Sequence, residues 1–179
     1  MLIDSHVHIF PDKFRSERQD LVAKDLTFRQ LYSNPKTRMV TADELISTMD
    51  ETGVDVSVVV GIGWQNFELA HRYNEYILDA QSRFPNRIVG FCAVNPGWGE
   101  LALIEAARCF EFGLKGIGEL HPDTQGFNLS DFTLMNPLME LIMHFDVPIL
   151  VHSSEPMGHN YAGKGTVHPA TLIAFIQKF

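Results

Sequence analysis

The chain has no long hydrophobic run, and this excludes a membrane-spanning helix from its expected architecture. A spanning helix needs about 18 to 20 consecutive apolar residues, and no uninterrupted apolar stretch in the 179 residues approaches that length. The first residues also contain neither the basic segment nor the apolar segment of a secretion signal. We therefore expect a soluble, cytoplasmic protein without a membrane partner.

Cysteine and positive charge are also scarce. Cys92 and Cys109 form no Cys-x-x-Cys pair, so neither a disulfide framework nor a cysteine metal knuckle is expected. Lys and Arg number 14 against 22 Asp and Glu, which gives a formal net charge of -8. This balance disfavours nucleic acid as the main partner, because polyanion binding rewards clustered cations. A small-molecule substrate is the expected partner instead.

Five short β-rich runs alternate with amphipathic helical patterns along the chain. The runs cover residues 2–9, 54–62, 87–94, 114–120 and 148–153. Thr41 with Glu44 has the pattern of a helical capping box, and Asn136 with Pro137 is expected to begin a helix as its cap and first residue. Several runs lack polar alternation, as strands covered on both faces do. The pattern therefore indicates a parallel sheet with helices outside.

The positions of charged and imidazole side chains favour an α/β fold of the (β/α)8 TIM-barrel type over an open doubly wound sheet. No glycine-rich phosphate loop follows the first run, whereas His8, Glu119 and His152 fall at run ends, where barrels carry their functional groups. Eight units need on the order of 250 residues. We therefore expect a single barrel domain over residues 1–179, truncated after about five βα units. An incomplete chain, or a second chain as in a homo-oligomer, would account for its open edge.

Residues 10–40 form a long insertion after the first run and mix basic with aromatic side chains, among them Arg15, Arg18, Phe28 and Tyr32. Because the insertion directly follows the strand that carries two histidines, we expect it over the pocket mouth as a lid or recognition loop. A solvated insertion without a functional part is the alternative.

Asp4, His6 and His8 alternate along the first run and therefore share one face of the expected strand. Two imidazoles at this spacing can bind one cation. Asp4 can hydrogen-bond a histidine from outside the ligand set and fix its tautomer. Ile3 and Val7 lie on the opposite face, where we expect them to pack against helices.

His152 and Glu119 extend this set. His152 ends a buried run, and with His6 and His8 it makes a three-nitrogen group of the kind that zinc prefers. Glu119 follows two closely spaced glycines at a strand end, where it can bind metal or carry a proton as a catalytic residue. The expected cofactor is Zn²⁺, with Mn²⁺ and Fe²⁺ as alternatives.

Three further residues are candidates for substrate binding. His121 lies two residues after Glu119 and would share its face if the strand continued. Tyr161 and Lys164 lie in a glycine-bearing stretch after the fifth run, where Lys164 would suit a substrate carboxylate.

The order of these motifs resembles that of the amidohydrolase superfamily, most closely the amidohydrolase-related branch that includes aminocarboxymuconate semialdehyde decarboxylase. The similar segments are Asp-Ser-His-Val-His at 4–8, Pro-Asn-Arg-Ile-Val-Gly-Phe at 85–91, Val-Asn-Pro at 94–96, Gly-Leu-Lys-Gly-Ile at 113–117 and Val-His at 151–152. The resemblance implies a metal-dependent (β/α)8 barrel with His6, His8 and His152 as ligands. It also implies a histidine after strand six and an aspartate after strand eight, and neither position exists in this sequence.

The resulting hypothesis is a metal-dependent hydrolase of amide, ester or lactone bonds, or a related decarboxylase, that acts on a small organic molecule through metal-bound water. Residues 116–119 also resemble strand four of TatD-like metal hydrolases, in which the glutamate is a ligand. A TatD-like phosphodiesterase or DNase is therefore one alternative. A catalytically inert partial barrel that needs a partner chain is the other.

Overall fold

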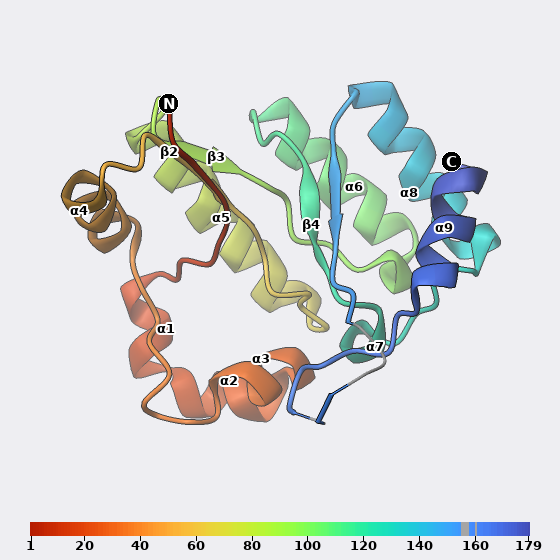
Figure 1. Cartoon of the computed structure of the whole chain (residues 1–179), viewed down its shortest axis with the longest axis horizontal. Coiled ribbons are helices and arrows are strands. Elements are labelled where there is room, and N and C mark those ends of the chain that lie inside the picture. Colours follow the sequence, from red (N-terminus) through yellow and green to blue (C-terminus); the bar gives the residue numbers. More distant parts are fainter. Residues whose placement is uncertain (155–157, 160) are drawn as a thin grey trace.

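Five parallel strands with helices outside them form the framework of the chain (Figure 1). The computed structural model describes residues 1–154, 158–159 and 161–179. The strands are β1 (Ile3–Val7), β2 (Val56–Val59), β3 (Ile88–Gly90), β4 (Ile117–Leu120) and β5 (Ile149–Val151). The first three form one sheet and the last two another.

Backbone hydrogen bonds connect the two sheets through the residues that follow β3. The N–H of Cys92 donates to the carbonyl of Gly116 at 2.7 Å, and the N–H of Gly118 donates to the carbonyl of Cys92 at 3.0 Å. Cys92 also forms a parallel bridge with Ile117. The five strands therefore lie side by side in chain order, as the first five strands of a (β/α)8 barrel do. This arrangement agrees with the predicted fold class.

Each strand is shorter than the β-rich run that predicted it: β4 begins three residues later than its run, and the other four strands also end before their runs do. His8 directly follows β1, His152 directly follows β5, and Glu119 lies within β4. Val7 is half-buried as expected, but Ile3 was expected to pack against helices and is 48% exposed. Ile3 is exposed because it begins β1, which lies at the edge of its sheet.

Side-chain caps mark the starts of four of the five long helices in the described part of the chain. These helices are α4 (Ala42–Thr52), α5 (Phe67–Arg83), α6 (Glu100–Glu111), α8 (Phe132–Phe145) and α9 (Pro169–Lys178). Of these five, only α6 begins without a side-chain cap. The capping box predicted from Thr41 and Glu44 is present at the start of α4. This helix ends at Gly53, which has a φ of 75° that glycine adopts without a steric penalty.

Helix α8 corrects one sequence prediction, because it begins five residues earlier than Asn136 and Pro137 indicated. The side chain of Asp131 accepts a hydrogen bond from the N–H of Leu134 at 3.1 Å and caps the helix. Pro137 consequently lies inside α8, where its missing N–H removes one backbone bond. Asp and Asn are equally favourable N-cap residues. The local sequence alone therefore could not show whether the helix begins after Asp131 or after Asn136.

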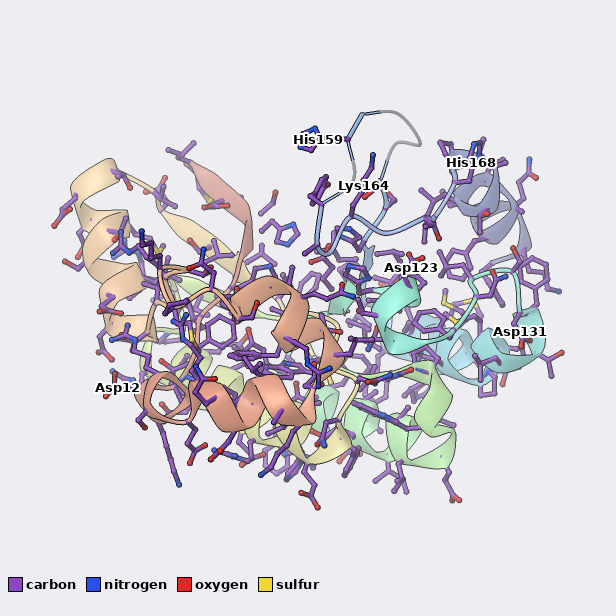
Figure 2. All side chains as sticks on the ribbon, turned by 90° about the horizontal axis from the view of Figure 1, so that it is seen from below. Asp12, Asp123, Asp131, His159, Lys164 and His168 are labelled. Carbon is purple, nitrogen blue, oxygen red and sulfur yellow. The ribbon has the colours of Figure 1, made fainter. Side chains whose placement is uncertain are left out.

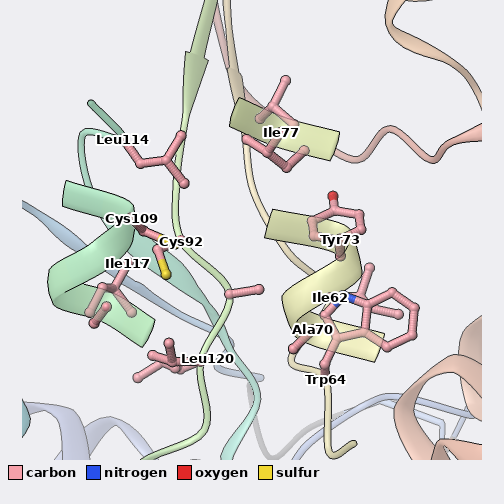
Figure 3. Packing of buried hydrophobic residues seen from close by; sticks show 14 of the residues in the cluster. Ile62, Trp64, Ala70, Tyr73, Ile77, Cys92, Cys109, Leu114, Ile117 and Leu120 are labelled. Atoms are coloured by element: carbon pink, nitrogen blue, oxygen red, sulfur yellow. The ribbon is translucent and has the colours of Figure 1, made fainter. Parts of the chain in front are cut away.

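The hydrophobic core lies between the strands and helices α5, α6 and α8. Figure 3 shows Tyr73 and Ile77 of α5 on one side of the strands, with Cys109 of α6 and Leu120 of β4 on the other. The buried hydroxyl of Tyr73 donates to the carbonyl of Val60 at 2.8 Å. This packing fixes the positions of the carboxyl ends of the strands. No helix in the described ranges is long and apolar enough to cross a membrane.

The insertion folds into three short helices, α1 (Asp12–Ser16), α2 (Arg18–Lys24) and α3 (Leu26–Tyr32), at the carboxyl ends of the strands (Figure 1). A short helix, α7 (Pro122–Gln125), lies next to α3. The hydroxyl of Thr27 lies 2.6 Å from the hydroxyl of Thr124 and donates to the carbonyl of Gly63 at 2.7 Å. The insertion is therefore joined to the barrel ends by buried polar contacts.

Asp25 is the strongest of these anchors. Its fully buried carboxylate accepts three backbone hydrogen bonds, from Phe28 at 2.9 Å, Gln65 at 2.8 Å and Asn66 at 2.9 Å. One bond caps α3, and the other two connect that helix to the start of α5. Whether the insertion acts as a lid stays a prediction.

Replacing Asp25 with alanine is expected to lower the free energy of unfolding by roughly 2 to 4 kcal/mol, because it removes a helix cap and leaves two partly buried N–H groups without their acceptor. Urea unfolding measures this loss, and Asp20→Ala at an exposed position of α2 is the matched control. A loss as small as that of the control would contradict an anchoring role for Asp25.

Candidate metal centre

Three side chains from two strands converge at the carboxyl end of the sheet. Nε2 of His6 lies 3.3 Å from Oε2 of Glu119, and Nε2 of His8 lies 3.9 Å from the same oxygen. One ligand atom from each of the three residues lies within 4.8 Å of the others. Two ligand atoms each about 2.1 Å from a tetrahedral metal are about 3.4 Å apart. The spacing of this group is therefore suited to a single ion.

The hydrogen bonds of His8 indicate that a cation belongs in this group. Nδ1 of His8 lies 3.0 Å from the carbonyl oxygen of Val60, which can only accept, so Nδ1 carries the proton. Burial lowers the pKa of His8, which favours the neutral ring. Nε2 therefore presents a lone pair to the carboxylate of Glu119. Two electron-rich atoms facing each other repel unless a cation lies between them, so these residues fit a divalent metal ion.

Glu119 also connects this group to His152. Nδ1 of His152 donates to Oε1 of Glu119 at 2.8 Å, and this bond raises the pKa of His152. Burial would raise the pKa of Glu119, but the hydrogen bond from His152 and the nearby histidines outweigh burial and lower it. The structure thus brings His152 to Glu119 but leaves it outside the group of three. Its part as a metal ligand stays a prediction.

Asp4 lies next to this group and contacts its main chain. Its Oδ1 accepts a hydrogen bond from the backbone N–H of His6 at 3.2 Å, and Asp4 itself is exposed. No contact with a histidine ring is among the hydrogen bonds found for Asp4 in the described residues. The bond to the backbone supports the local shape of β1, which is different from the predicted effect on an imidazole tautomer.

A cavity of about 510 Å³ lies beside His152. All three residues predicted to bind substrate, namely His121, Tyr161 and Lys164, line it. Figure 2 shows Lys164 on the segment that follows β5, near Asp123 of α7. Nζ of Lys164 lies 3.3 Å from the carbonyl oxygen of His159. The structure therefore groups these candidates at one opening, and their contact with a substrate stays a prediction.

His121 forms the inner wall of this cavity and is 2% exposed. Its ring stacks on that of His152, with centroids 4.1 Å apart and planes 11° from parallel. Ser154 lines the same cavity, and its hydroxyl lies 3.5 Å from Nε2 of His152. The candidate metal centre and the cavity are therefore adjacent.

Two contributions to the site were not predicted from the sequence. Asp123 of α7 accepts a hydrogen bond from the backbone N–H of Thr166 at 2.8 Å and another from its hydroxyl, and so holds the segment after β5. Tyr32 of α3 has its pKa raised to about 12, first by burial and then by the negative charge of Glu119. The position of Asp123 after a His-Pro pair is a helix-start signal, but no local pattern indicates that Tyr32 lies near Glu119.

Comparisons with known proteins agree with this architecture. The amidohydrolase family model matches residues 3–179. No match was found among curated proteins. Solved structures with a similar fold include 5-carboxyvanillate decarboxylase from Novosphingobium aromaticivorans, complexed with manganese and 4-hydroxy-3-methoxy-5-nitrobenzoic acid. It has a TM-score of 0.67 and 23% identity over 86% of this chain and 50% of that one.

Two further structures are similar to the same degree. 2,6-Dihydroxybenzoate decarboxylase, complexed with 2,6-dihydroxybenzoate, has a TM-score of 0.62 and 18% identity over 88% of this chain and 52% of that one. A putative amidohydrolase from Staphylococcus aureus has a TM-score of 0.59 and 23% identity over 97% of this chain and 55% of that one. The chain thus spans about half the length of each of these proteins.

The likeness to these structures confirms the predicted barrel-type fold. The match to the family model covers nearly every residue of the chain, from the strand that carries His6 and His8 to the last helix. The resemblance inferred from the sequence motifs is therefore confirmed, and the chain belongs to the amidohydrolase family.

Proposed function

We propose that this chain binds one divalent metal ion through His6, His8 and Glu119 and contributes that site to a decarboxylase or hydrolase of a small organic molecule. The observation that carries the proposal is the convergence of one ligand atom each from His6, His8 and Glu119 within 4.8 Å of one another. When bound, the ion would supply Lewis acidity, lowering the pKa of a bound water and polarising a carbonyl or carboxylate group.

The other residues of the site have parts that follow from their contacts. Glu119 holds the ring of His152 through the bond from Nδ1, and His152 is the proposed additional ligand. To bind metal through Nδ1, His152 would exchange its N–H···O bond for the ion. His121, Tyr161 and Lys164 would contact substrate in the neighbouring cavity, where the ammonium of Lys164 suits an anionic group.

The identity of the ion is a finer part of the proposal. Two imidazoles and a carboxylate suit Zn²⁺, which remains the expected ion. A set that includes a carboxylate also suits Mn²⁺, and manganese is the metal in the complex of 5-carboxyvanillate decarboxylase. Loading the metal-free protein with equal concentrations of the two ions, followed by elemental analysis, distinguishes them.

The alternative functions have less support. One group of three metal-ligand residues occurs among the described residues, which favours one ion over the pair expected of a TatD-like phosphodiesterase. The net charge of -8 also disfavours a nucleic-acid substrate. A catalytically inert partial barrel would not require His6, His8 and Glu119 to converge at one point. A cytoplasmic location and a homo-oligomeric state remain proposals from the sequence.

The metal site is tested by adding Zn²⁺ or Mn²⁺ to protein treated with a chelator. We expect one ion per chain and, at a metal concentration 100 times the Kd, a rise in Tm of about 5 to 10 °C, because binding to the folded state alone adds about 2.7 kcal/mol. Removing the ion should abolish both the shift and any turnover.

His6→Ala is the variant that should lose this response, and His144→Ala at an exposed position of α8 is its control. A wild-type protein that retains no divalent ion, together with an unchanged His6→Ala variant, would defeat the proposal.

A further inference from the structure

We infer that His121 is a positioning residue that fixes the ring of His152 against Glu119 by face-to-face stacking. This inference rests on the proposed metal site, because the orientation of His152 matters only where Glu119 and the neighbouring histidines share an ion. No sequence motif indicates it, since His121 follows β4 whereas His152 follows β5.

The ring of His152 is held on several sides. Nδ1 donates to Glu119 at 2.8 Å, and one face lies on His121 with the ring centroids 4.1 Å apart. Gly165 approaches so closely that a Cβ added there would lie 3.0 Å from Cδ2 of His152. The hydrogen bond to Glu119 alone would leave the ring of His152 free to tilt about that bond. The flat ring of His121 against its face limits this tilt. Stacking therefore determines the plane in which His152 meets Glu119.

His121 can serve as a fixed surface because its own backbone is held by α7. Its N–H donates to Oε1 of Gln125 at 2.8 Å, and its carbonyl accepts from the N–H of Gln125 at 2.9 Å. The amide of Gln125 also donates to the carbonyls of Trp64 and Val94, each at 2.9 Å. These residues follow β2 and β3. His121 is therefore attached to the ends of two other strands through one buried side chain.

Close packing and one hydrogen bond fix the side chain of His121. Nε2 donates to the carbonyl of Gly163 at 3.1 Å, so Nε2 carries the proton and Nδ1 has a lone pair. A Cβ added to Gly63 would lie 2.5 Å from the Cβ of His121, so the barrel end fits closely around the residue. The buried Nδ1 has no hydrogen-bond partner among the described residues. The ring of His121 thus makes one hydrogen bond, and its main contact with the site is the stacking of its flat face on His152.

The decisive comparison is between His121→Phe and His121→Leu. Both variants lose the bond to Gly163 and are apolar and buried, but only phenylalanine retains a flat ring against His152. We expect His121→Leu to weaken Mn²⁺ binding by about tenfold and His121→Phe to remain closer to wild type than to His121→Leu. His144→Ala, remote from the site, should match wild type.

A second measurement, on the metal-free proteins, tests the position of the His152 ring separately from metal binding. At an alkaline pH, where His152 is neutral, ring ¹⁵N signals should show a protonated Nδ1 on His152 in wild type and His121→Phe, and values averaged between the two tautomers in His121→Leu. Thermal unfolding reports whether each variant folds, and His121→Asn replaces the leucine variant if that one does not.

Each outcome has a separate meaning. Equal losses in the leucine and phenylalanine variants, or no loss in either, would overturn the inference. A wild-type protein that binds neither Zn²⁺ nor Mn²⁺ would overturn the proposed function, and the ¹⁵N comparison would still decide the part of His121.

Discussion

Replacing Glu119 with glutamine is expected to weaken Mn²⁺ or Zn²⁺ binding by more than about 100-fold. This loss exceeds the one usually found when a residue that only hydrogen-bonds to a metal ligand is replaced. The carboxylate is the anionic member of the group and lies 3.3 Å from Nε2 of His6 and 3.9 Å from Nε2 of His8. Glutamine retains the shape but removes the charge that a divalent ion requires. Equilibrium dialysis with elemental analysis measures the change directly.

The control for this substitution is Glu51→Gln, at an exposed position of α4. Its affinity for metal should equal that of wild type, because the residue lies on a helix remote from the strand ends. Metal binding that survives in Glu119→Gln within a factor of a few would show that the histidines alone hold the ion. Glu119 would then be only the hydrogen-bond partner of His152.

Replacing Glu105 with alanine is expected to lower the free energy of unfolding by about 3 to 5 kcal/mol, the range for removing one member of a buried ion pair. The buried carboxylate accepts from Nε of Arg108 at 2.9 Å and from the amide of Asn74 at 2.8 Å. Nδ1 of His71 lies 3.0 Å from it. The substitution removes the acceptor that these donors share between α5 and α6, although Arg108 keeps its pair with Glu75. Urea unfolding at neutral pH measures the loss, and Glu105→Gln should lose less.

The ion pair of Glu105 with Arg108 also predicts how the free energy of unfolding depends on pH. Burial would raise the pKa of Glu105, but hydrogen bonds from Arg108, Asn74 and His71 outweigh it and lower the pKa. The stabilisation is therefore fully present above the ordinary glutamate pKa of about 4.3 and is lost as the pH falls through the lower folded-state value. The difference in unfolding free energy between wild type and Glu105→Ala should shrink in that acidic range.

Glu75 provides the matched control, because it also pairs with Arg108, at 2.6 Å, but is 55% exposed. Glu75→Gln should change stability by less than about 1 kcal/mol, since solvent screens exposed pairs. A loss in Glu105→Ala no larger than that of this control would contradict the importance of the buried network.

The strands and their order were predictable because local residue patterns determine them. Hydrophobic runs without polar alternation indicate buried parallel strands, and a capping box such as Thr41 with Glu44 marks a helix start whatever the tertiary context. The start of α8 was not predictable in this way, since Asp131 and Asn136 are equivalent caps. The three helices of the insertion were also missed, because each is too short to show a helical period.

The candidate site was predictable only in part. His6 lies in β1 and His8 directly follows it, so their spacing alone places them together. The approach of Glu119 depends on the register and twist of separate strands, which are tertiary properties. The stacking of His121 on His152 has the same origin. A sequence pattern can therefore indicate residues of suitable chemistry at strand ends, but not which of them touch.

The outer edge of β1 has a consequence for every solution measurement on this chain. Among the strands of the described residues, β1 pairs with β2 alone, and Ile3 and Leu2 are 48% and 54% exposed. An edge of this kind can add a strand from another molecule. Apparent stability and metal affinity should then vary with protein concentration, as in any system linked to self-association. Dilution series are therefore part of each experiment, because the values of the isolated molecule are those reached at the dilute limit.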